Sequence, residues 1–508
     1  MKQWLDRMTG TITMYKLILF TLIAMELIAL VLSLFGQLSY PPLALIASAV
    51  VAVAFTWGTS RVVSRLLRIR QHSESAIITA LLILFIMQPK LDLLGLSGIA
   101  LAGVVAGASK YLIAIRGRHI FNPAALGAFV PTMIVFTTFI GMSYGLWWIG
   151  TPLMQLPVYI GAFLILYRTQ RLTVGVSFIV LAATLATVVA VSGGQAVGPA
   201  IQQVLLQSPI VFFAGFMLSE PLTLPPRRWQ QLVEVVVVAF LFAVPLPIGP
   251  VSNSPLFALL VGNLIGFAFG QRRAIRLEFL SKRQIGPTTW ELAFQPVRPV
   301  RFAPGQYMEL TIPHRKADFR GSRRYFSISS APTAEGPITF AITLPSKSSS
   351  FKQALLDLPQ GAYVHGTSVG GDFVLPTSVD EPLLLVAGGI GVTPFASQLA
   401  YATERGEKRD VVVVYQNSAA GELPYSGLLE KSGVRVVLFA PEAPSPLPAN
   451  WSYAGAGRVD GARLAEAVPD AQRRRAFISG PPALVSELKK ALRTQGVRRV
   501  HSDYFSGY

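Results

Sequence analysis

The apolar residues of this chain are concentrated in its first 270 positions, in a series of stretches of membrane-spanning length. Across all 508 residues, 52% are hydrophobic and only 14% are charged, a balance too apolar for an ordinary soluble protein. The sequence after residue 272 has the composition of a soluble protein. The pattern therefore predicts a helical membrane domain over residues 1–272, followed by soluble domains.

The apolar stretches number about ten, and the loops between them alternate in charge. The stretches lie at residues 13–35, 41–58, 75–88, 95–115, 121–140, 151–167, 172–192, 205–218, 231–247 and 254–270. Every second loop is basic, namely 61–70, 116–118, 168–171, 227–228 and 271–273. Because basic loops stay on the cytoplasmic side, this alternation predicts an even number of spans. We expect a multi-pass protein of the inner (plasma) membrane, in contact with the lipid bilayer, with both termini in the cytoplasm.

Charge and cysteine content limit the partners and cofactors. The formal net charge is +18, but the arginines of the apolar half lie in short loops, where membrane topology explains them. No nucleic-acid partner is therefore expected. The chain has no cysteine, which excludes disulfides and cysteine-ligated iron–sulfur clusters, and we predict no metal site.

The apolar half contains a pattern that occurs twice. The separation between Pro89 and Pro123 equals the separation between Pro221 and Pro255. Matched segments interrupted by proline predict discontinuous helices in two repeated halves. The backbone groups freed at such breaks must line a site or be covered by protein.

Three short motifs of this half resemble one family of membrane flavoproteins. They are Ser-Ala-Ile-Ile-Thr-Ala-Leu-Leu at 75–82, Lys110 followed by Phe-Asn-Pro-Ala at 121–124, and Ser-Glu-Pro-Leu-Thr at 219–223. Their order is that of the D subunit of the Rnf complex and the B subunit of the Nqr complex, which most of residues 13–270 resembles. The resemblance implies about ten helices in two repeated halves, with flavins bound among them.

The resemblance also implies a covalent flavin. In that family an FMN is esterified through its phosphate to a threonine, and the nearest match here is Thr151, in a loop where its hydroxyl would be exposed. The alternative is that Thr151 and Pro152 simply begin a helix, as N-cap and first residue.

A second flavin, FMN or riboflavin, is implied at a non-covalent position of the helical half. The residues that match this position are Asn122, Ser219, Glu220 and Thr223. A carboxylate at membrane depth is costly without a purpose. The alternative for Glu220 is an interfacial carboxylate paired with Arg227 or Arg228.

From residue 273 the periodicity of the sequence changes to that of strands. Apolar and polar residues alternate at 276–280, 290–294, 307–312 and 338–342, which predicts a small antiparallel β-barrel over 273–378. Over 379–508, short apolar strands alternate with helical stretches, which predicts an α/β domain with a doubly wound parallel sheet. The predicted fold class is thus multidomain: an all-α polytopic membrane domain, then a β-barrel, then an α/β domain.

Residues 324–327, Arg-Tyr-Phe-Ser in a predicted strand, resemble the FAD-binding signature of the ferredoxin–NADP reductase superfamily. The planar guanidinium of an arginine bonds two pyrophosphate oxygens at once. Residues 348–352 open a helix, and their amides and hydroxyls would face the same diphosphate. The resemblance implies that Phe326 packs on the flavin and that Ser327 bonds its ring edge. The residues assigned to FAD are Arg324, Tyr325, Phe326, Ser327, Ser349, Ser350, Phe351 and Lys352.

A glycine-rich turn follows the predicted strand 383–387, where glycines let the backbone approach a phosphate. This turn and Ser-Gly-Pro-Pro at 479–482 resemble the nicotinamide loops of the same superfamily, and the aromatic segment 504–508 resembles the one that covers its flavin. The residues assigned to these sites are Gly388, Gly389, Gly391, Thr393, Pro394, Gly480, Pro481 and Phe505. The predicted catalytic residues are Ser327, Ser479, which replaces the family's cysteine, and Phe505.

The choice of dinucleotide is predicted from cations near the second strand of the α/β domain. Residues 416–418 follow that strand and contain no cation, which favours NADH. The three arginines at 473–475 leave NADPH as the alternative dinucleotide.

These features predict an NAD(P)H:acceptor oxidoreductase. Electrons would pass from cytoplasmic NADH through FAD to a membrane flavin, and on to a quinone or an extracytoplasmic redox protein. A haem-type ferric reductase is one alternative, but it needs about four membrane histidines, and the apolar half has only His72 and His119. A redox-regulated or redox-coupled ion transporter is another, compatible with broken helices. The oligomeric state stays open.

Overall fold

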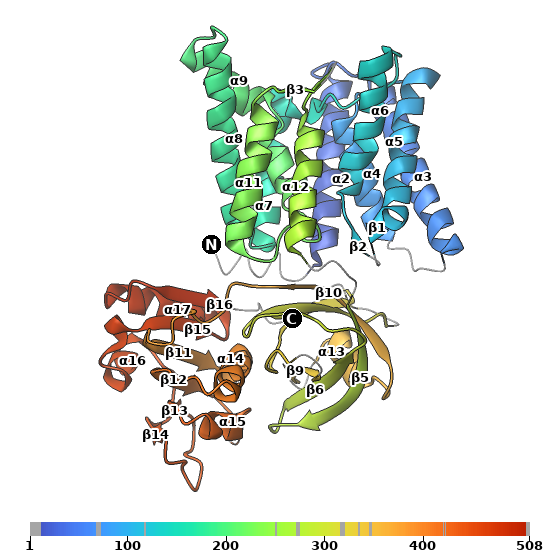
Figure 1. Cartoon of the computed structure of the whole chain (residues 1–508). Coiled ribbons are helices and arrows are strands. Elements are labelled where there is room, and N and C mark those ends of the chain that lie inside the picture. Colours follow the sequence, from blue (N-terminus) through green and yellow to red (C-terminus); the bar gives the residue numbers. More distant parts are fainter. Residues whose placement is uncertain are drawn as a thin grey trace. The chain divides into compact units, whose positions relative to one another are not determined.

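The computed structural model describes residues 12–67, 73–115, 118–248, 251–270, 275–314, 318, 321–333, 336–344, 348–419, 421 and 423–503. The chain divides into two compact units, Met1–Arg273 and Ala274–Tyr508 (Figure 1). The first unit is helical, and the second contains two six-stranded sheets. His72 and Phe505, both named in the sequence predictions, lie outside the described residues.

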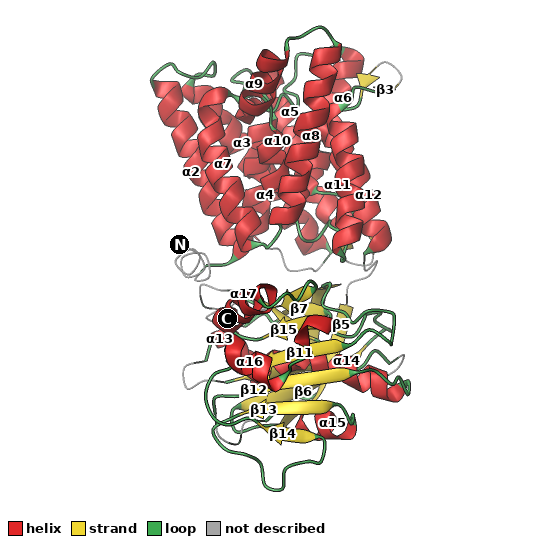
Figure 2. Cartoon of the chain, turned by 90° about the vertical axis from the view of Figure 1, so that its left-hand side faces the viewer, coloured by secondary structure: helices red, strands yellow, loops and turns green. Residues whose placement is uncertain are grey.

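The first unit has helix at every segment where a span was predicted (Figure 2). Its helices are α2 (Met14–Leu34), α3 (Pro42–Leu66), α4 (Ser73–Ile86), α5 (Leu93–Leu112), α6 (Pro123–Thr138), η1 (Trp148–Gly150), α7 (Pro152–Arg168), α8 (Leu172–Ser192), α9 (Val197–Gln207), α10 (Ile210–Phe212), the π-helical η2 (Phe213–Leu218), α11 (Arg228–Ala243) and α12 (Pro255–Phe269). Two short antiparallel hairpins complete the unit: β1 (Ala114–Ile115) with β2 (Arg118–His119), and β3 (Pro247–Ile248) with β4 (Val251–Ser252).

The number of membrane-length helices is smaller than predicted. Within the described ranges, four helices are long and apolar enough to cross a membrane: α2, α3, α5 and α8. A fifth is added if α9 and the segment Ile210–Leu218, which meet at 47°, form one bent crossing. Helices such as α4 and α12, with 14 and 15 residues, reach less than the ~30 Å of a hydrocarbon core at ~1.5 Å per residue. The predicted count of about ten spans is therefore not supported.

The same order of elements occurs twice in the helical unit. α5 packs against α3 and α6, and α11 packs against α8 and α12. A hairpin precedes the last helix of each half, β1–β2 before α6 and β3–β4 before α12. Both of these helices begin with proline, at Pro123 and Pro255, where the missing N–H would have no helical partner in any case. These two prolines thus start helices and do not interrupt them.

Six antiparallel strands form a barrel in the second unit. They are β5 (Ile275–Gln284), β6 (Thr289–Pro296), β7 (Tyr307–Thr311), β8 (Arg323–Ser327), β9 (Ile338–Thr343) and β10 (Tyr363–Gly370), in the order β8-β7-β10-β5-β6-β9. A bridge between Ile328 and Phe340 joins the two outer strands and closes the barrel. The helix α13 (Ser350–Leu356) follows β9, and its Phe351 and Leu355 are buried in the barrel core.

Six parallel strands form the second sheet, in the order β14-β13-β12-β11-β15-β16. The strands are β11 (Leu383–Gly388), β12 (Val411–Gln416), β13 (Arg435–Phe439), β14 (Trp451–Tyr453), β15 (Arg475–Ser479) and β16 (Val500–Asp503). The helices are η3 (Gly389–Val392), α14 (Thr393–Glu404), α15 (Ser426–Lys431), α16 (Gly461–Ala467), η4 (Ala471–Arg473) and α17 (Pro482–Thr494).

Helices cover both faces of this parallel sheet, which is why β11 is apolar along its whole length. Leu383 and Leu385 pack with α14 and α15 on one face, and Leu384 and Val386 pack with α16 and α17 on the other. The chain leaves β11 towards β12 and returns to its other side at β15. Such a reversal of strand order opens a crevice at the carboxyl ends of the strands, where ligands bind in doubly wound sheets.

A buried arginine joins the amino ends of two strands of this sheet. Arg474 is 9% exposed and donates from Nη2 to Oδ2 of Asp470 at 2.6 Å and from Nη1 to Oδ1 of Asp410 at 2.7 Å. We expect Arg474→Ala to lower the free energy of unfolding by about 1–2 kcal/mol, because the charge-assisted bonds to Asp470 and Asp410 are lost. Denaturant titration measures this loss, and the exposed neighbour supplies the control as Arg473→Ala, which should leave stability unchanged.

The same cluster predicts a dependence of stability on pH. The hydrogen bond from Arg474 holds the pKa of Asp470 below its ordinary value. The folded state therefore binds this proton less readily than the unfolded state. The stabilisation is complete above the ordinary aspartate pKa and is lost as the pH falls through the lowered pKa of the folded protein.

Candidate flavin and dinucleotide sites

Arg324, in β8, lies at the centre of a cluster in the barrel. Its side chain is 5% exposed and donates from Nη1 to the carbonyl oxygens of Arg323 at 2.7 Å and Gly321 at 3.1 Å. Nη2 lies 3.4 Å from Oδ1 of Asp318. The guanidinium also lies over the ring of Phe351, 5.2 Å from its centroid. The arginine predicted to bind a diphosphate is thus held in place by backbone and by α13.

The start of α13 lies beside β8 through further contacts. The rings of Phe326 and Phe351 stack with centroids 5.9 Å apart. The hydroxyl of Ser350 accepts from the backbone N–H of Asp318 at 3.0 Å and lies 3.0 Å from Nε2 of His314. These contacts join residues far apart in the sequence, and they bring together the predicted residues Arg324, Phe326, Ser350 and Phe351.

The remaining predicted FAD residues have other surroundings. Tyr325 and Ser327 lie on the opposite face of β8 from Arg324, because side chains alternate along a strand. The ring of Tyr325 packs edge-on against Tyr307, with centroids 5.3 Å apart. Ser349 caps α13 by accepting from the backbone N–H of Lys352, and Nζ of Lys352 donates to the carbonyl oxygen of Thr343 at 2.8 Å. We find these two side chains engaged in holding α13.

The predicted glycine-rich turn leads from β11 into α14, and two of its glycines lack space for a side chain. A Cβ on Gly391 would lie 2.3 Å from the carbonyl oxygen of Ser479, and a Cβ on Gly388 would lie 2.5 Å from Cδ2 of Leu484. Gly389 has a φ of +55°, and a Cβ added there would have nothing within 4 Å. The turn therefore packs on the end of β15 on one side and is open on the other.

A pocket of about 280 Å³ lies at the carboxyl ends of β11 and β12. It is lined by Gly388, Gly389, Gln416, Asn417, Ser418, Arg458, Pro481, Ala483 and Leu484. Three residues predicted for dinucleotide binding line it, namely Gly388, Gly389 and Pro481. Arg458, Ala483 and Leu484 were not predicted, because no motif marks them.

The other residues predicted for dinucleotide binding lie outside this lining. Ser479, only 2% exposed, ends β15 behind the turn, and Gly480 follows it with a φ of +156°. Thr393 and Pro394 begin α14 and are buried there, and the hydroxyl of Thr393 donates to the carbonyl oxygen of Ile390. These residues shape the crevice from behind.

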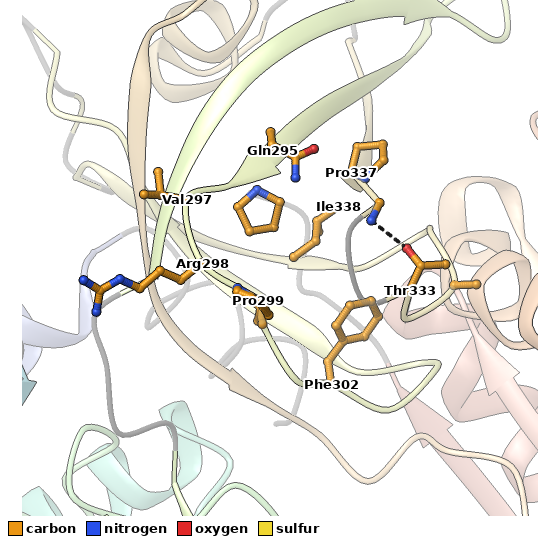
Figure 3. Close-up of a pocket in the computed structure, with 12 residues that line it drawn as sticks. Gln295, Val297, Arg298, Pro299, Phe302, Thr333, Pro337 and Ile338 are labelled. Atoms are coloured by element: carbon orange, nitrogen blue, oxygen red, sulfur yellow. Dashed lines mark hydrogen bonds between the residues drawn. The ribbon is translucent and has the colours of Figure 1, made fainter.

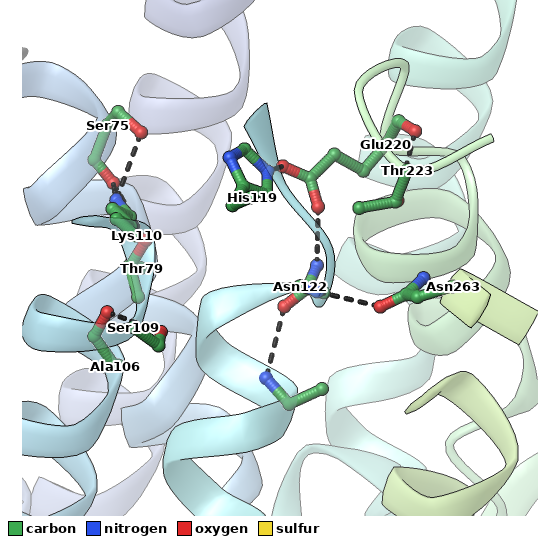
Figure 4. A network of polar contacts seen from close by, with 11 residues as sticks. Ser75, Thr79, Ala106, Ser109, Lys110, His119, Asn122, Glu220, Thr223 and Asn263 are labelled. Carbon is green, nitrogen blue, oxygen red and sulfur yellow. Dashed lines mark hydrogen bonds and ion pairs between the residues drawn. The ribbon is translucent and has the colours of Figure 1, made fainter. Parts of the chain in front are cut away.

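A polar network in the helical unit joins its two halves (Figure 4). Asn122, at the start of α6, donates from Nδ2 to Oε2 of Glu220 at 2.9 Å, and from its backbone N–H to Oδ1 of Asn263 in α12 at 2.7 Å. Nε2 of His119 lies 3.6 Å from Oε1 of Glu220. Two predicted residues, Asn122 and Glu220, are thus in direct contact, and the ion pair found for Glu220 is with His119.

The other residues of this predicted flavin position are engaged locally. The hydroxyl of Ser219 donates to the carbonyl oxygen of Gly215 at 2.8 Å, and the hydroxyl of Thr223 donates to the carbonyl oxygen of Glu220 at 3.3 Å. Sequence reasoning did not assign Asn263 to the site. Its side chain is 1% exposed, and within the described part of the chain its Nδ2 has no hydrogen-bond partner. A buried donor without a partner is a group whose hydrogen bond a polar ligand or a water could supply.

The surroundings of Thr151 differ from those expected for a site of covalent flavin attachment. It is the N-cap of α7 and precedes Pro152, as in the helix-start alternative, but its side chain makes no capping hydrogen bond. The expectation of an exposed hydroxyl is wrong, because Oγ1 of Thr151 is buried. The loop before α7 folds back as η1, and three large apolar residues there are buried: Trp147, Trp148 and Ile149.

A further pocket of about 430 Å³ opens on the barrel (Figure 3). It is lined by Gln295, Pro296, Val297, Arg298, Pro299, Val300, Phe302, Ala331, Thr333, Gly336, Pro337 and Ile338. The backbone N–H of Gly336 donates to the hydroxyl of Thr333 at 3.1 Å and shapes one side. No residue predicted for flavin or dinucleotide binding is among the lining residues.

Comparison with known proteins supports the reductase module. No family model matches the chain. It is similar to the ferredoxin reductase component of 3-ketosteroid-9-alpha-monooxygenase from Mycolicibacterium smegmatis, with 28% identity over 204 residues, covering 40% of this chain and 54% of that protein. It is also similar to the reductase subunit of aromatic O-demethylase from Amycolatopsis sp., with 27% identity over 219 residues, covering 41% of this chain and 62% of that protein.

A third relative is the flavohemoprotein of Bordetella pertussis, with 25% identity over 281 residues, covering 49% of this chain and 68% of that protein. The chain spans about half the length of the first curated relatives that it matches. Among solved structures, a cytochrome P450 reductase from Amycolatopsis has a TM-score of 0.39 at 24% identity, covering 46% of this chain and 70% of that chain. These curated relatives are named as a ferredoxin reductase component, an NADPH oxidoreductase, a reductase subunit and a flavohemoprotein, and they support a ferredoxin reductase-like module in this chain.

Proposed function

We propose that this chain is an integral-membrane NAD(P)H-dependent flavin oxidoreductase. Electrons from cytoplasmic NADH pass through FAD in the second unit to a flavin in the helical unit, and then to a quinone or an extracytoplasmic redox protein. The main support for the proposal is that three features occur in one chain: the pocket at the carboxyl ends of β11 and β12, the Arg324 cluster, and a unit of apolar helices with a polar network. Curated relatives support the reductase part.

The residues of the barrel cluster fit FAD by their chemistry. Arg324 supplies a planar guanidinium for the diphosphate. Asp318 connects it to Ser350, because the carboxylate of Asp318 pairs with Arg324 and its backbone N–H donates to the hydroxyl of Ser350. Phe326 is half-buried and offers a ring to the flavin. FAD, when bound, accepts a hydride and releases its electrons singly. Ser327, at the end of β8, is assigned to the edge of the flavin ring.

The pocket beside β11 fits a dinucleotide. Gly388 and Gly389 leave the backbone open towards the pocket, so that a phosphate can reach the amides of the turn. Gln416 and Asn417 stand at the end of β12, where a doubly wound sheet meets an adenosine ribose. Ser479 is assigned to positioning the turn, because it is buried behind Gly391. We propose domain limits of 273–378 for the FAD barrel and 379–508 for this domain.

The network in the helical unit is assigned to the second flavin, FMN or riboflavin, as in the Rnf D and Nqr B subunits that this unit resembles. The buried Nδ2 of Asn263 offers a donor. Oδ1 of the same side chain accepts from Asn122, which donates to Glu220, and Glu220 lies beside His119. We propose a multi-pass topology with cytoplasmic termini, with shorter helices completing the spans. A covalent FMN on Thr151 requires the loop to expose the hydroxyl, and the mass of the intact protein tests it.

The experiment that tests this function is the visible spectrum of the detergent-purified protein, read as flavin per chain. About two flavins per chain, reduced on addition of NADH, are expected if both units bind one. About one flavin per chain would limit the proposal to the second unit and remove the membrane flavin. A Soret band would instead indicate haem and overturn the proposed electron path.

Asn122→Ala should lower the flavin content from about two to about one per chain, because it removes the side-chain amide that donates to Glu220. The backbone N–H that donates to Asn263 remains in this variant. The variant also loses an N-cap, so the matched control is Ser254→Ala, which removes the equivalent N-cap of α12. The control should keep both flavins. Equal flavin loss in the two variants would assign the effect to helix stability and not to the network.

A further inference from the structure

The lining of the dinucleotide pocket contains one charged side chain among the described residues, Arg458. Its neighbour Val459 donates from its backbone N–H to Oε1 of Gln416 at 3.0 Å, which ties the loop of Arg458 to the end of β12. Arg458 thus lines the pocket together with the neutral residues Asn417 and Ser418, which follow this strand. In a doubly wound sheet, this is the place that meets the 2′ position of the adenosine ribose.

The charge of Arg458 is matched by a carboxylate on α17. Nη2 of Arg458 lies 2.7 Å from Oε2 of Glu487, and the two side chains are 50% and 42% exposed. Glu487 is one helical turn after Ala483, which lines the pocket, so both lie on the same side of α17. A 2′-phosphate that approached Arg458 would therefore also approach a negative charge.

We infer that the ion pair between Arg458 and Glu487 sets the preference of this pocket for NADH over NADPH. The inference rests on the proposed function and names the residues that select its electron donor. Arg458 is the cation that a 2′-phosphate needs. Glu487 pairs with this cation and also repels the phosphate, since both are negatively charged. NADH, which has a hydroxyl at this position, is accepted without breaking the pair.

The test is Glu487→Gln in the full-length, detergent-purified protein, assayed with ferricyanide as electron acceptor. The variant should raise kcat/KM for NADPH by about tenfold, because Arg458 becomes free to bond the phosphate. The value for NADH should change by less than about twofold. Adding Arg458→Ala to Glu487→Gln should abolish the gain. Glu430→Gln, an exposed site on α15, makes the same change in net charge and should have no effect.

Binding of nucleotide fragments gives a second measurement that does not depend on the flavin. Calorimetry should show that Glu487→Gln strengthens the binding of 2′,5′-ADP by about tenfold and leaves that of AMP unchanged. Equal gains for both fragments, no gain for either, or a wild-type preference for NADPH would overturn the inference. If the wild-type protein oxidises neither dinucleotide and binds neither fragment, it is the proposed function that fails. If it oxidises NADH and Glu487→Gln changes nothing, only this inference fails.

Discussion

Gly391→Ala is expected to slow the reduction of bound FAD by NADH by about 100-fold while the FAD content stays normal. A Cβ at this position would lie 2.3 Å from the carbonyl oxygen of Ser479 and 2.7 Å from Cα of Gly480. Both are backbone atoms, so the turn after β11 and the end of β15 must move apart. The change displaces the floor of the dinucleotide pocket and leaves the barrel unchanged. Single-turnover reduction by NADH, with flavin content as a parallel measurement, tests this.

Two other glycines supply graded controls for this variant. Gly427, in α15, has open space around a Cβ and an ordinary φ, so Gly427→Ala should behave as wild type. Gly389 also has open space but a φ of +55°, so Gly389→Ala should cost about 1–2 kcal/mol of backbone strain without a collision. If Gly391→Ala and Gly427→Ala reduce FAD equally fast, the close approach to β15 does not matter for the dinucleotide.

The sequence predicted the parallel sheet well because its strands are marked by composition alone. A run such as 383–387 must be apolar on both faces, since helices cover both sides of β11. The turn after it was predicted for a similar reason, because only glycine tolerates the close approach seen at Gly391. Both patterns involve residues that are adjacent in the chain, so they can be recognised in a single sequence.

Contacts made by topology could not be predicted in this way. Arg458 joins the dinucleotide pocket because the loop after β14 returns to the end of β12, and no spacing in the sequence records that return. His314 reaches Ser350, and Asn263 reaches Asn122, for the same reason. The buried Oγ1 of Thr151 is a further case, since its burial depends on the fold of the preceding loop. Single polar residues of this kind form no periodic pattern in the sequence, so their contacts cannot be predicted from it.

The predicted count of about ten membrane spans is not supported, for a different physical reason. Hydropathy measures how apolar a stretch is, and it placed a helix correctly at each apolar segment. The length of a helix depends on where its backbone bonds end, as at Pro123, which starts α6, and after Ile86, where α4 ends before a span is complete. Several apolar segments are therefore shorter as helices than as hydrophobic stretches.

Arg324→Ala is expected to weaken the binding of FAD by about 100-fold, the largest effect of any single change in the barrel. The guanidinium of Arg324 offers a planar pair of N–H donors for a diphosphate. It is also held by the carbonyl oxygens of Gly321 and Arg323 and lies over Phe351, so that it does not have to be ordered when FAD binds. Fluorescence titration of flavin-depleted protein with FAD measures the affinity.

Because Arg324 is buried and paired with Asp318, its removal also acts on the fold, and the two effects must be separated. Arg324→Lys keeps the positive charge and loses the planar pair of N–H donors, so it should weaken FAD binding by about tenfold with little loss of stability. Arg283→Ala removes an exposed arginine that is paired with Glu291 on the same barrel, and it should leave FAD binding unchanged. A folded Arg324→Ala protein that binds FAD as tightly as the wild type would remove this arginine from the FAD site, and with it the main reason for placing FAD between β8 and α13.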